Sequence, residues 1–155
     1  MPTRADARPC SVADALAVVG EKYALLVLRE VFYGVRRFDE IQRNTGAPRD
    51  VLTARLRRLE DAGVLTRRRY SDRPPRFEYR LTDAGRELRP VLMTLMAWGD
   101  KHLAARPYVV FEHSCGADLD PMTVCRACGR EVADGELTPH YDVAGWNEDG
   151  TRAAG

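Results

Sequence analysis

Apolar residues recur every three to four positions through most of the first 106 residues, which is the period of an α-helix with one buried face. This period predicts five helices, over residues 11–19, 23–33, 38–43, 48–62 and 83–104. Ser11 is placed to cap the first helix, and a glycine follows the first, second and fourth. Pro90 lies inside the last span, so we expect that helix to kink about one turn earlier.

The helix predicted over residues 48–62 separates its side chains into two faces. Pro48 takes its first position, where a missing backbone N–H costs nothing, and Asn44-Thr45-Gly46 forms the turn before it. Leu52, Leu56 and Leu59 make an apolar stripe that we expect to be buried. The opposite face presents side chains suited to contacting a ligand: Arg49, Asp50, Thr53 and Arg57.

The period changes to two after Gly63. Residues 64–70 and 76–81 are predicted to be strands, and the turn residues 71–75 join them into a hairpin. Helix, turn, second helix and hairpin follow one another in the order of a winged helix-turn-helix. In that fold the second helix enters the major groove of DNA, and the hairpin reaches an adjacent groove or its phosphates. The expected fold class is therefore mainly α with a small β hairpin.

Charge divides the chain more sharply than overall composition does. The net charge is only +1, yet residues 1–106 hold 21 Lys and Arg against 14 Asp and Glu, while residues 107–155 hold 3 against 9. Of the 24 basic residues all but two are arginines, which suit bidentate contacts with phosphate and guanine. A basic segment of this kind favours nucleic acid as the partner. The alternative is that these arginines form only a solvated face.

Motifs in unbroken order from about residue 10 to residue 104 resemble the HxlR-type regulators. They are Gly20-Glu21-Lys22-Tyr23, Arg37-Phe38-Asp39-Glu40-Ile41, Val51-Leu52-Thr53-Ala54-Arg55-Leu56, Pro74-Pro75-Arg76-Phe77-Glu78-Tyr79 and Leu81-Thr82-Asp83-Ala84-Gly85. Tyr23 departs from the family, which usually has tryptophan there. The resemblance implies a bacterial transcription regulator that dimerises through its first and last helices. It would bind a palindromic operator as a homodimer and act as a repressor.

The resemblance also carries residue roles over by position. It implies that Arg49, Asp50, Thr53 and Arg57 are the exposed positions of the recognition helix and that residues 72–76 form the wing tip. The expected DNA contacts are Arg37, Arg49, Asp50, Thr53, Arg57, Arg73 and Arg76. Arg55 matches a recurrent arginine of the family, and an intramolecular anchor is its alternative role. Cys10 matches a cysteine that some members use as a thiol sensor, and a helix N-terminus favours its thiolate. We prefer a structural cysteine at the dimer interface for this position.

Three of the four cysteines follow residue 107 in a pattern typical of metal ligands. His113-x-Cys115-Gly116 and Cys125-x2-Cys128-Gly129 each place two ligands just before a glycine, as in a tight knuckle. This predicts one structural zinc per chain, bound by His113, Cys115, Cys125 and Cys128, with His140 as a competing fourth ligand. A Cys125–Cys128 dithiol pair is the redox alternative. A zinc deaminase is excluded, because Cys115 stands where the His-x-Glu motif requires glutamate.

These observations predict an N-terminal arm (1–10), a winged helix-turn-helix DNA-binding and dimerisation domain (11–106), a zinc-ribbon-like appendage (107–144) that opens with a β-like run at 108–111, and a disordered tail (145–155). No apolar run reaches the ~20 residues of a membrane span and no secretory leader opens the chain, so a cytoplasmic protein is expected. No nucleophile–base pair or open metal site can be named, so an enzyme is not expected. The expected partners are double-stranded DNA, a second copy of the chain and a small-molecule effector. The rival is a redox or metal sensor whose DNA binding is switched through Cys10 or the thiols of Cys115, Cys125 and Cys128.

Overall fold

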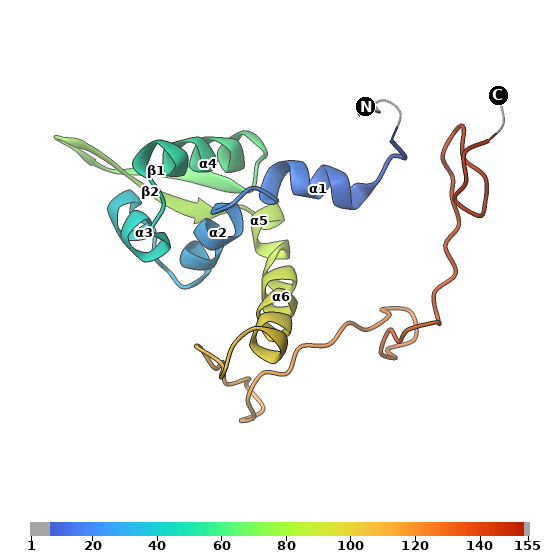
Figure 1. Cartoon of the computed structure of the whole chain (residues 1–155). Helices are drawn as coiled ribbons and strands as arrows, with labels where there is room; N and C mark the ends of the chain where they lie inside the picture. Colours follow the sequence, from blue (N-terminus) through green and yellow to red (C-terminus); the bar gives the residue numbers. More distant parts are fainter. Residues whose placement is uncertain (1–6, 154–155) are drawn as a thin grey trace. The chain divides into compact units, whose positions relative to one another are not determined.

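Helices dominate the first two thirds of the chain in a computed structural model that describes residues 7–153 (Figure 1). In chain order the elements are α1 (Ser11–Val19), α2 (Ala24–Phe32), α3 (Phe38–Thr45), α4 (Arg49–Asp61), β1 (Leu65–Asp72), β2 (Pro75–Leu81), α5 (Asp83–Glu87) and α6 (Arg89–His102). The arm predicted over residues 1–10 lies largely outside the described residues. Contacts divide the described residues into two units: residues 14–121, and residues 7–13 together with residues 122–153.

The core of the 14–121 unit lies where α2, α3, α4 and the hairpin meet. α2 packs against α3, α4, β2 and α6, and α4 packs against β1. The largest fully buried side chains are Val27, Leu28, Ile41, Leu52, Leu56 and Leu59. Half of these form the leucine stripe of α4, so the burial predicted from its helical period is confirmed. Each such side chain stabilises the fold by about 1.5–3 kcal/mol through the removal of apolar surface from water.

The connection between α3 and α4 is shorter than the sequence indicated. α3 continues to Thr45, two residues beyond its predicted end, so Asn44 and Thr45 are helical and Gly46 caps the helix at φ 67°. Pro48 is the N-cap of α4 rather than its first residue, because its ψ of 145° is extended and Arg49 begins the helix. The polar Asn-Thr pair favours a turn, but both side chains hydrogen-bond without leaving the helix.

The single kinked helix predicted over residues 83–104 is in fact two helices. α5 and α6 separate at Leu88, two residues before Pro90, which stands in the first turn of α6. Proline is accommodated there because the first helical N–H groups have no partner within the helix. Thr82 is the N-cap of α5, and its hydroxyl accepts a hydrogen bond from Gly85 N at 3.1 Å. Among residues 7–153, no helix combines the length and the apolar character needed to cross a membrane.

The two strands form an antiparallel hairpin whose far end projects from the core. Leu65 faces Leu81 at the base, and the register slips by one residue between Arg69 and Ser71. The strands reach Asp72 and begin again at Pro75, so the predicted turn over 71–75 shrinks to two residues. Side chains are buried only near the base of this hairpin, which is why its tip is available to a partner.

Beyond α6, the described residues contain only isolated β-bridges. Residues 108–111 are not a strand as predicted, since no strand in the described part of the chain pairs with them and Tyr108 and Val110 are exposed. Three bridges follow, between Glu112 and Asp118, Val124 and Glu131, and Trp146 and Arg152. The last of them lies in the segment for which the sequence predicts disorder.

Candidate nucleic-acid interface and cysteine hairpins

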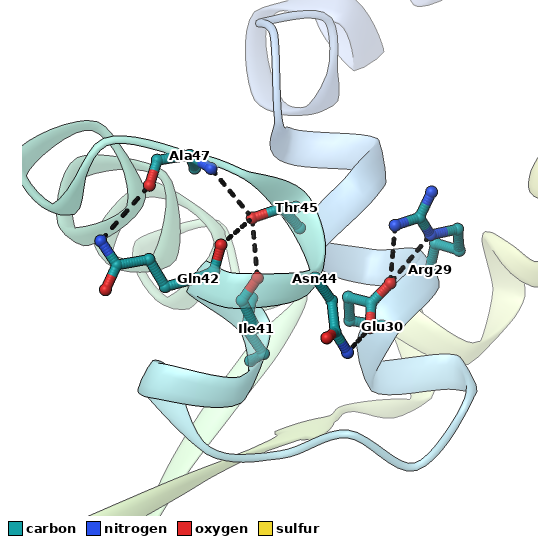
Figure 2. A network of polar contacts seen from close by, with 7 residues as sticks. All are labelled: Arg29, Glu30, Ile41, Gln42, Asn44, Thr45 and Ala47. Atoms are coloured by element: carbon teal, nitrogen blue, oxygen red, sulfur yellow. Dashed lines mark hydrogen bonds and ion pairs between the residues drawn. The ribbon is translucent and has the colours of Figure 1, made fainter.

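Side-chain hydrogen bonds fix the turn between α3 and α4 (Figure 2). Thr45 Oγ1 donates to Ile41 O at 2.7 Å and accepts from Ala47 N at 3.4 Å. Gln42 Nε2 donates to Ala47 O at 3.4 Å, so both sides of Gly46 are held. These contacts set the direction in which α4 leaves α3, which is the geometric requirement of a helix-turn-helix.

A buried carboxylate ties α2 to the same turn (Figure 2). Glu30 is 4% exposed, and it is the one charged residue that is buried among residues 7–153. Its Oε1 accepts from Arg29 Nη2 at 2.7 Å, and its Oε2 accepts from Asn44 Nδ2 at 2.7 Å. Because a buried carboxylate is costly unless it is paired and hydrogen-bonded, both donors stabilise this arrangement. Glu30 is not among the residues predicted from the sequence, although a lone glutamate inside a densely apolar helix is a signal of such a buried polar contact.

The face of α4 opposite the leucine stripe carries the predicted DNA contacts. Arg49, Asp50 and Arg57 are exposed there, and Thr53 is half-buried. Arg49 is partly engaged, because its Nη1 lies 3.3 Å from Asp39 Oδ1 and its guanidinium 4.7 Å from the Phe38 ring centre. Thr53 Oγ1 donates to Arg49 O at 2.8 Å. Arg57 has no hydrogen-bond or ion-pair partner within residues 7–153, so its guanidinium is available to a ligand.

Two other arginines of α4 hold the fold together instead. Arg58 donates from Nε and Nη2 to Ala17 O, at 2.8 and 2.6 Å, and so anchors the end of α1. Arg55 pairs with Glu21 and donates from Nε to Lys22 O at 3.3 Å. Of the two roles left open for Arg55, the structure shows the intramolecular anchor.

The hairpin presents its remaining predicted contacts at the tip. Arg73 and Arg76 are exposed there and have no ion-pair partner within the described residues. Nearer the core, arginines stack on aromatic rings: Arg67 lies 4.6 Å from the centre of the Phe77 ring, and Arg37 lies 5.1 Å from that of Tyr70. If Arg37 contacts DNA as predicted, it does so with a guanidinium that already lies over the Tyr70 ring.

Charge in the hairpin is only partly balanced internally. Arg80 Nη2 lies 2.6 Å from Glu78 Oε1, and this hydrogen bond lowers the pKa of the Glu78 carboxyl. Burial raises the pKa of the Tyr79 phenol at the base. Glu78 is thus paired with Arg80, and Asp72 Oδ1 lies 3.1 Å from Arg69 Nε, which leaves Arg73 and Arg76 as the tip arginines without an ion-pair partner among the described residues.

Each predicted pair of metal ligands is brought together by its own hairpin. The Glu112–Asp118 bridge closes the first, in which His113 Nδ1 lies 3.2 Å from Cys115 Sγ. The Val124–Glu131 bridge closes the second, in which the thiols of Cys125 and Cys128 are hydrogen-bonded. The backbone N–H and the guanidinium of Arg130 lower the pKa of the Cys128 thiol.

The predicted zinc site itself remains a prediction. Within residues 7–153, no group of three or more His, Cys, Asp or Glu side chains converges closely enough to hold a metal ion. The first ligand pair belongs to the 14–121 unit and the second to the other unit. His140 is exposed and lies outside both hairpins, and Cys10 is exposed immediately before α1.

Known proteins share this sequence pattern. A family profile described as HxlR-like helix-turn-helix matches residues 18–107. The uncharacterized HTH-type transcriptional regulator Rv3095 of Mycobacterium tuberculosis is 46% identical over 132 residues, which cover 83% of this chain and 84% of that protein. The uncharacterized HTH-type transcriptional regulator YdeP of Bacillus subtilis is 36% identical over 98 residues, which cover 63% of this chain and 77% of its own.

Solved structures share the fold. PA1607, which is named as a transcription factor, superposes with a TM-score of 0.75 at 31% identity, covering 87% of this chain and 96% of its own. PA1374 of Pseudomonas aeruginosa, also named as a transcription factor, gives a TM-score of 0.60 at 35% identity, covering 91% and 97%. The redox regulator HypR in its oxidized form gives 0.54 at 32% identity, covering 62% of this chain and all of the other.

Proposed function

The chain belongs to the HxlR-like helix-turn-helix family of transcriptional regulators, and from this premise we propose that it is a sequence-specific repressor that binds a palindromic operator as a homodimer. α4 would enter the major groove, and the hairpin would contact neighbouring phosphates. The roles assigned to individual residues follow from which arginines the fold leaves unpaired.

The proposal rests on a difference among the arginines of α4. The side chains of Arg55 and Arg58 donate hydrogen bonds that hold α4 against the α1–α2 segment. Arg57, between them, is exposed and unpaired within the described residues, on the side away from the core. If the arginines of α4 formed only a solvated face, the anchoring of Arg55 and Arg58, which fixes the orientation of α4, would have no purpose. The arrangement therefore favours DNA readout by Arg57.

Affinity measurements on matched variants test this assignment, with a site first identified by sequencing DNA recovered after crosslinking. Arg57→Ala should weaken binding to that site by about 1–3 kcal/mol and relax the preference at particular base pairs. Arg73→Ala and Arg76→Ala should instead weaken all duplexes alike and reduce the salt slope by about one unit. Arg106→Ala, at an exposed arginine outside this surface, is the control. Wild-type affinity in all three test variants at physiological salt would show that the surface is misassigned.

Dimer formation is supported by an apolar face of α6. Leu95 and Trp98 are 48% and 54% exposed, and Val91 lies on the same helix with a similar exposure. An apolar patch on one face of a helix is a common basis for self-association. A two-fold dimer would bury this face and place two copies of α4 about one DNA turn apart, roughly 34–36 Å.

A single charged substitution tests the dimer. Leu95→Glu should give a folded monomer with weak DNA binding, because each copy would contact only half a palindrome. Leu92 is unsuitable for this test, since it is buried and a charge there would break the core. Light scattering gives the mass, with Val110→Glu, an exposed position outside α6, as the matched control. A soluble Leu95→Glu protein of dimeric mass with unchanged DNA binding would remove the assignment.

A second candidate function is redox control of DNA binding. It is favoured by the similarity to HypR, which is named as a redox regulator, and by the exposure of Cys10. Under this alternative, a mild disulfide-forming oxidant should weaken DNA binding by the wild type but not by Cys10→Ser. Equal affinity of the reduced and oxidised wild type would leave the constitutive repressor as the better account. Residues 107–144 supply none of the basic contacts, so the repressor proposal holds whether or not they bind metal.

A further inference from the structure

Three short hairpins follow α6, and two of them share one hydrogen-bond pattern. In the first, His113 N donates to Ala117 O at 2.8 Å and Gly116 N donates to His113 O at 2.8 Å. In the third, Asn147 N donates to Thr151 O at 2.8 Å and Gly150 N to Asn147 O at 2.9 Å. Residue for residue, His113 corresponds to Asn147 and Cys115 to Asp149. The two hairpins are the same turn with different side chains.

The second hairpin is one residue longer and is built alike. Cys125 N donates to Arg130 O at 2.8 Å, and Gly129 N donates to Cys125 O at 2.7 Å. Gly116 and Gly129 have φ of 87° and 71°, so glycine is the residue that each turn requires directly after its last cysteine.

The third hairpin serves as an internal control for the first two. It closes with neither cysteine nor histidine, because Asp149 Oδ1 accepts from Thr151 N at 2.8 Å and satisfies the turn locally. The turn itself therefore does not need sulfur or imidazole ligands. The His113–Cys115 and Cys125–Cys128 pairs must have another reason to stand in this position, and neither pair is buried as a packing group.

This part of the chain also lacks a hydrophobic core. None of the residues 107–153 is buried, and apolar side chains such as Val124 and Leu137 are exposed. A segment of this size without a core usually depends on a metal or on disulfides for its order. Ligand pairs at the tips of two hairpins are the arrangement from which closed tetrahedral sites are built.

We infer that His113, Cys115, Cys125 and Cys128 bind one zinc ion per chain as a closed, structural site. His113 Nδ1 and Cys115 Sγ, 3.2 Å apart, are already close to the edge of about 3.5 Å that follows from tetrahedral coordination with Zn–N ~2.0 Å and Zn–S ~2.3 Å. The nine residues 116–124 between the pairs are long enough to let both hairpins reach one ion. Three thiolates and one imidazole suit zinc and leave no open position for catalysis.

His113 is assigned as the fourth ligand in preference to His140. Its ring nitrogen already faces a cysteine of its own hairpin, whereas His140 stands outside both hairpins. Binding converts three thiols into thiolates and releases their protons to solvent, so the apparent affinity should fall as the pH is lowered.

Metal analysis of the full chain, purified under reducing conditions without chelator, tests the site. We expect one zinc per chain, and X-ray absorption of the zinc protein should fit three sulfurs at ~2.3 Å and one nitrogen at ~2.0 Å. Titration of metal-free protein with Co²⁺ should give the visible absorption of tetrahedral cobalt thiolate and saturate at one ion per chain. Because this titration uses the wild type, it does not depend on how well any variant folds.

Variants then test the ligand assignment. Cys128→Ser and His113→Ala should each lose stoichiometric metal, while Cys10→Ser and His140→Ala should retain it. Retention by His113→Ala with loss by His140→Ala would overturn the choice of the fourth ligand. Absence of metal from the reduced protein, together with failure to bind zinc or cobalt, would overturn the site and favour a Cys125–Cys128 disulfide. None of these outcomes depends on DNA binding, so this proposal and the proposed function can fail separately.

Discussion

The helical region up to residue 102 and the segment after residue 107 acquire structure in different ways. Val27, Leu28, Ile41 and the α4 leucines are fully buried in the first region, and helix ends and turns are arranged around that core. In the second, no described residue is buried and the described backbone is organised by isolated bridges and short hydrogen-bonded turns. The same chain therefore combines a region ordered by the hydrophobic effect with one whose side chains offer thiols and imidazole instead.

The two regions differ in charge as well as in packing. Residues 1–106 hold an excess of basic residues, and residues 107–155 an excess of acidic ones. An acidic segment would be repelled by DNA phosphates, whereas the arginines of α4 and of the hairpin tip would be attracted. We therefore propose DNA as the ligand of the first region and metal as that of the second.

The largest expected contrast is between equal truncations in the two regions. Leu56→Ala should lower the free energy of unfolding by about 2–5 kcal/mol, because it leaves a cavity in the core. Leu137→Ala removes the same side chain at a position that is 72% exposed. This variant should change the free energy of unfolding by less than about 0.5 kcal/mol. Urea unfolding followed by circular dichroism measures both. Similar losses in the two variants would break the comparison.

A smaller contrast is expected between two asparagines. Asn44→Ala removes a donor from the buried Glu30 carboxylate and should destabilise the fold by about 1–3 kcal/mol. Asn147→Ala removes a hydrogen bond of 3.0 Å to exposed Thr151, and water replaces it at a cost below about 0.5 kcal/mol. The same unfolding experiment compares them. If Asn44→Ala costs no more than Asn147→Ala, the turn before α4 is not held as described.

The smallest effect concerns pH. Burial raises the pKa of the Tyr79 phenol above its ordinary value of 10.0, so the folded state favours the neutral form. That contribution to stability is present below pH 10 and is lost as the pH rises through the higher pKa of the folded state. The urea midpoint of the wild type should therefore fall more steeply above pH 10 than that of Tyr79→Phe. Parallel curves for the two proteins would contradict this account of Tyr79.

The sequence predicted those parts of the fold that depend on periodicity. The stripe Leu52, Leu56 and Leu59 and the hairpin at residues 65–81 follow from periods of 3.6 and 2, which burial on one face imposes. The ends of elements were less predictable, because Asn44 and Thr45 satisfy their side chains inside a helix and Pro48 is compatible with two positions at its start. Residues 108–111 have the composition of a strand, but no strand within residues 7–153 pairs with them.

In the candidate sites, too, local features could be predicted from the sequence and contacts between distant parts of the chain could not. Exposure of Arg57 follows from its place on α4, but the anchoring of Arg55 and Arg58 depends on the chain from Ala17 to Lys22, which no local pattern reveals. The hairpins at Gly116 and Gly129 were predictable because glycine directly after a ligand pair is a local signal. The third hairpin, which has neither cysteine nor histidine, has the same turn as the first, and only the backbone hydrogen bonds reveal this similarity.

Hydrogen exchange on the full-length protein, with and without a strong zinc chelator, tests the division of the chain most directly. We expect chelation to remove protection from the amides of residues 108–132, because the metal would supply most of their order. The amides of α2 to α6 should keep their protection, since no predicted ligand lies before residue 107. Unchanged protection over 108–132, or loss of protection throughout the helical region, would contradict the account.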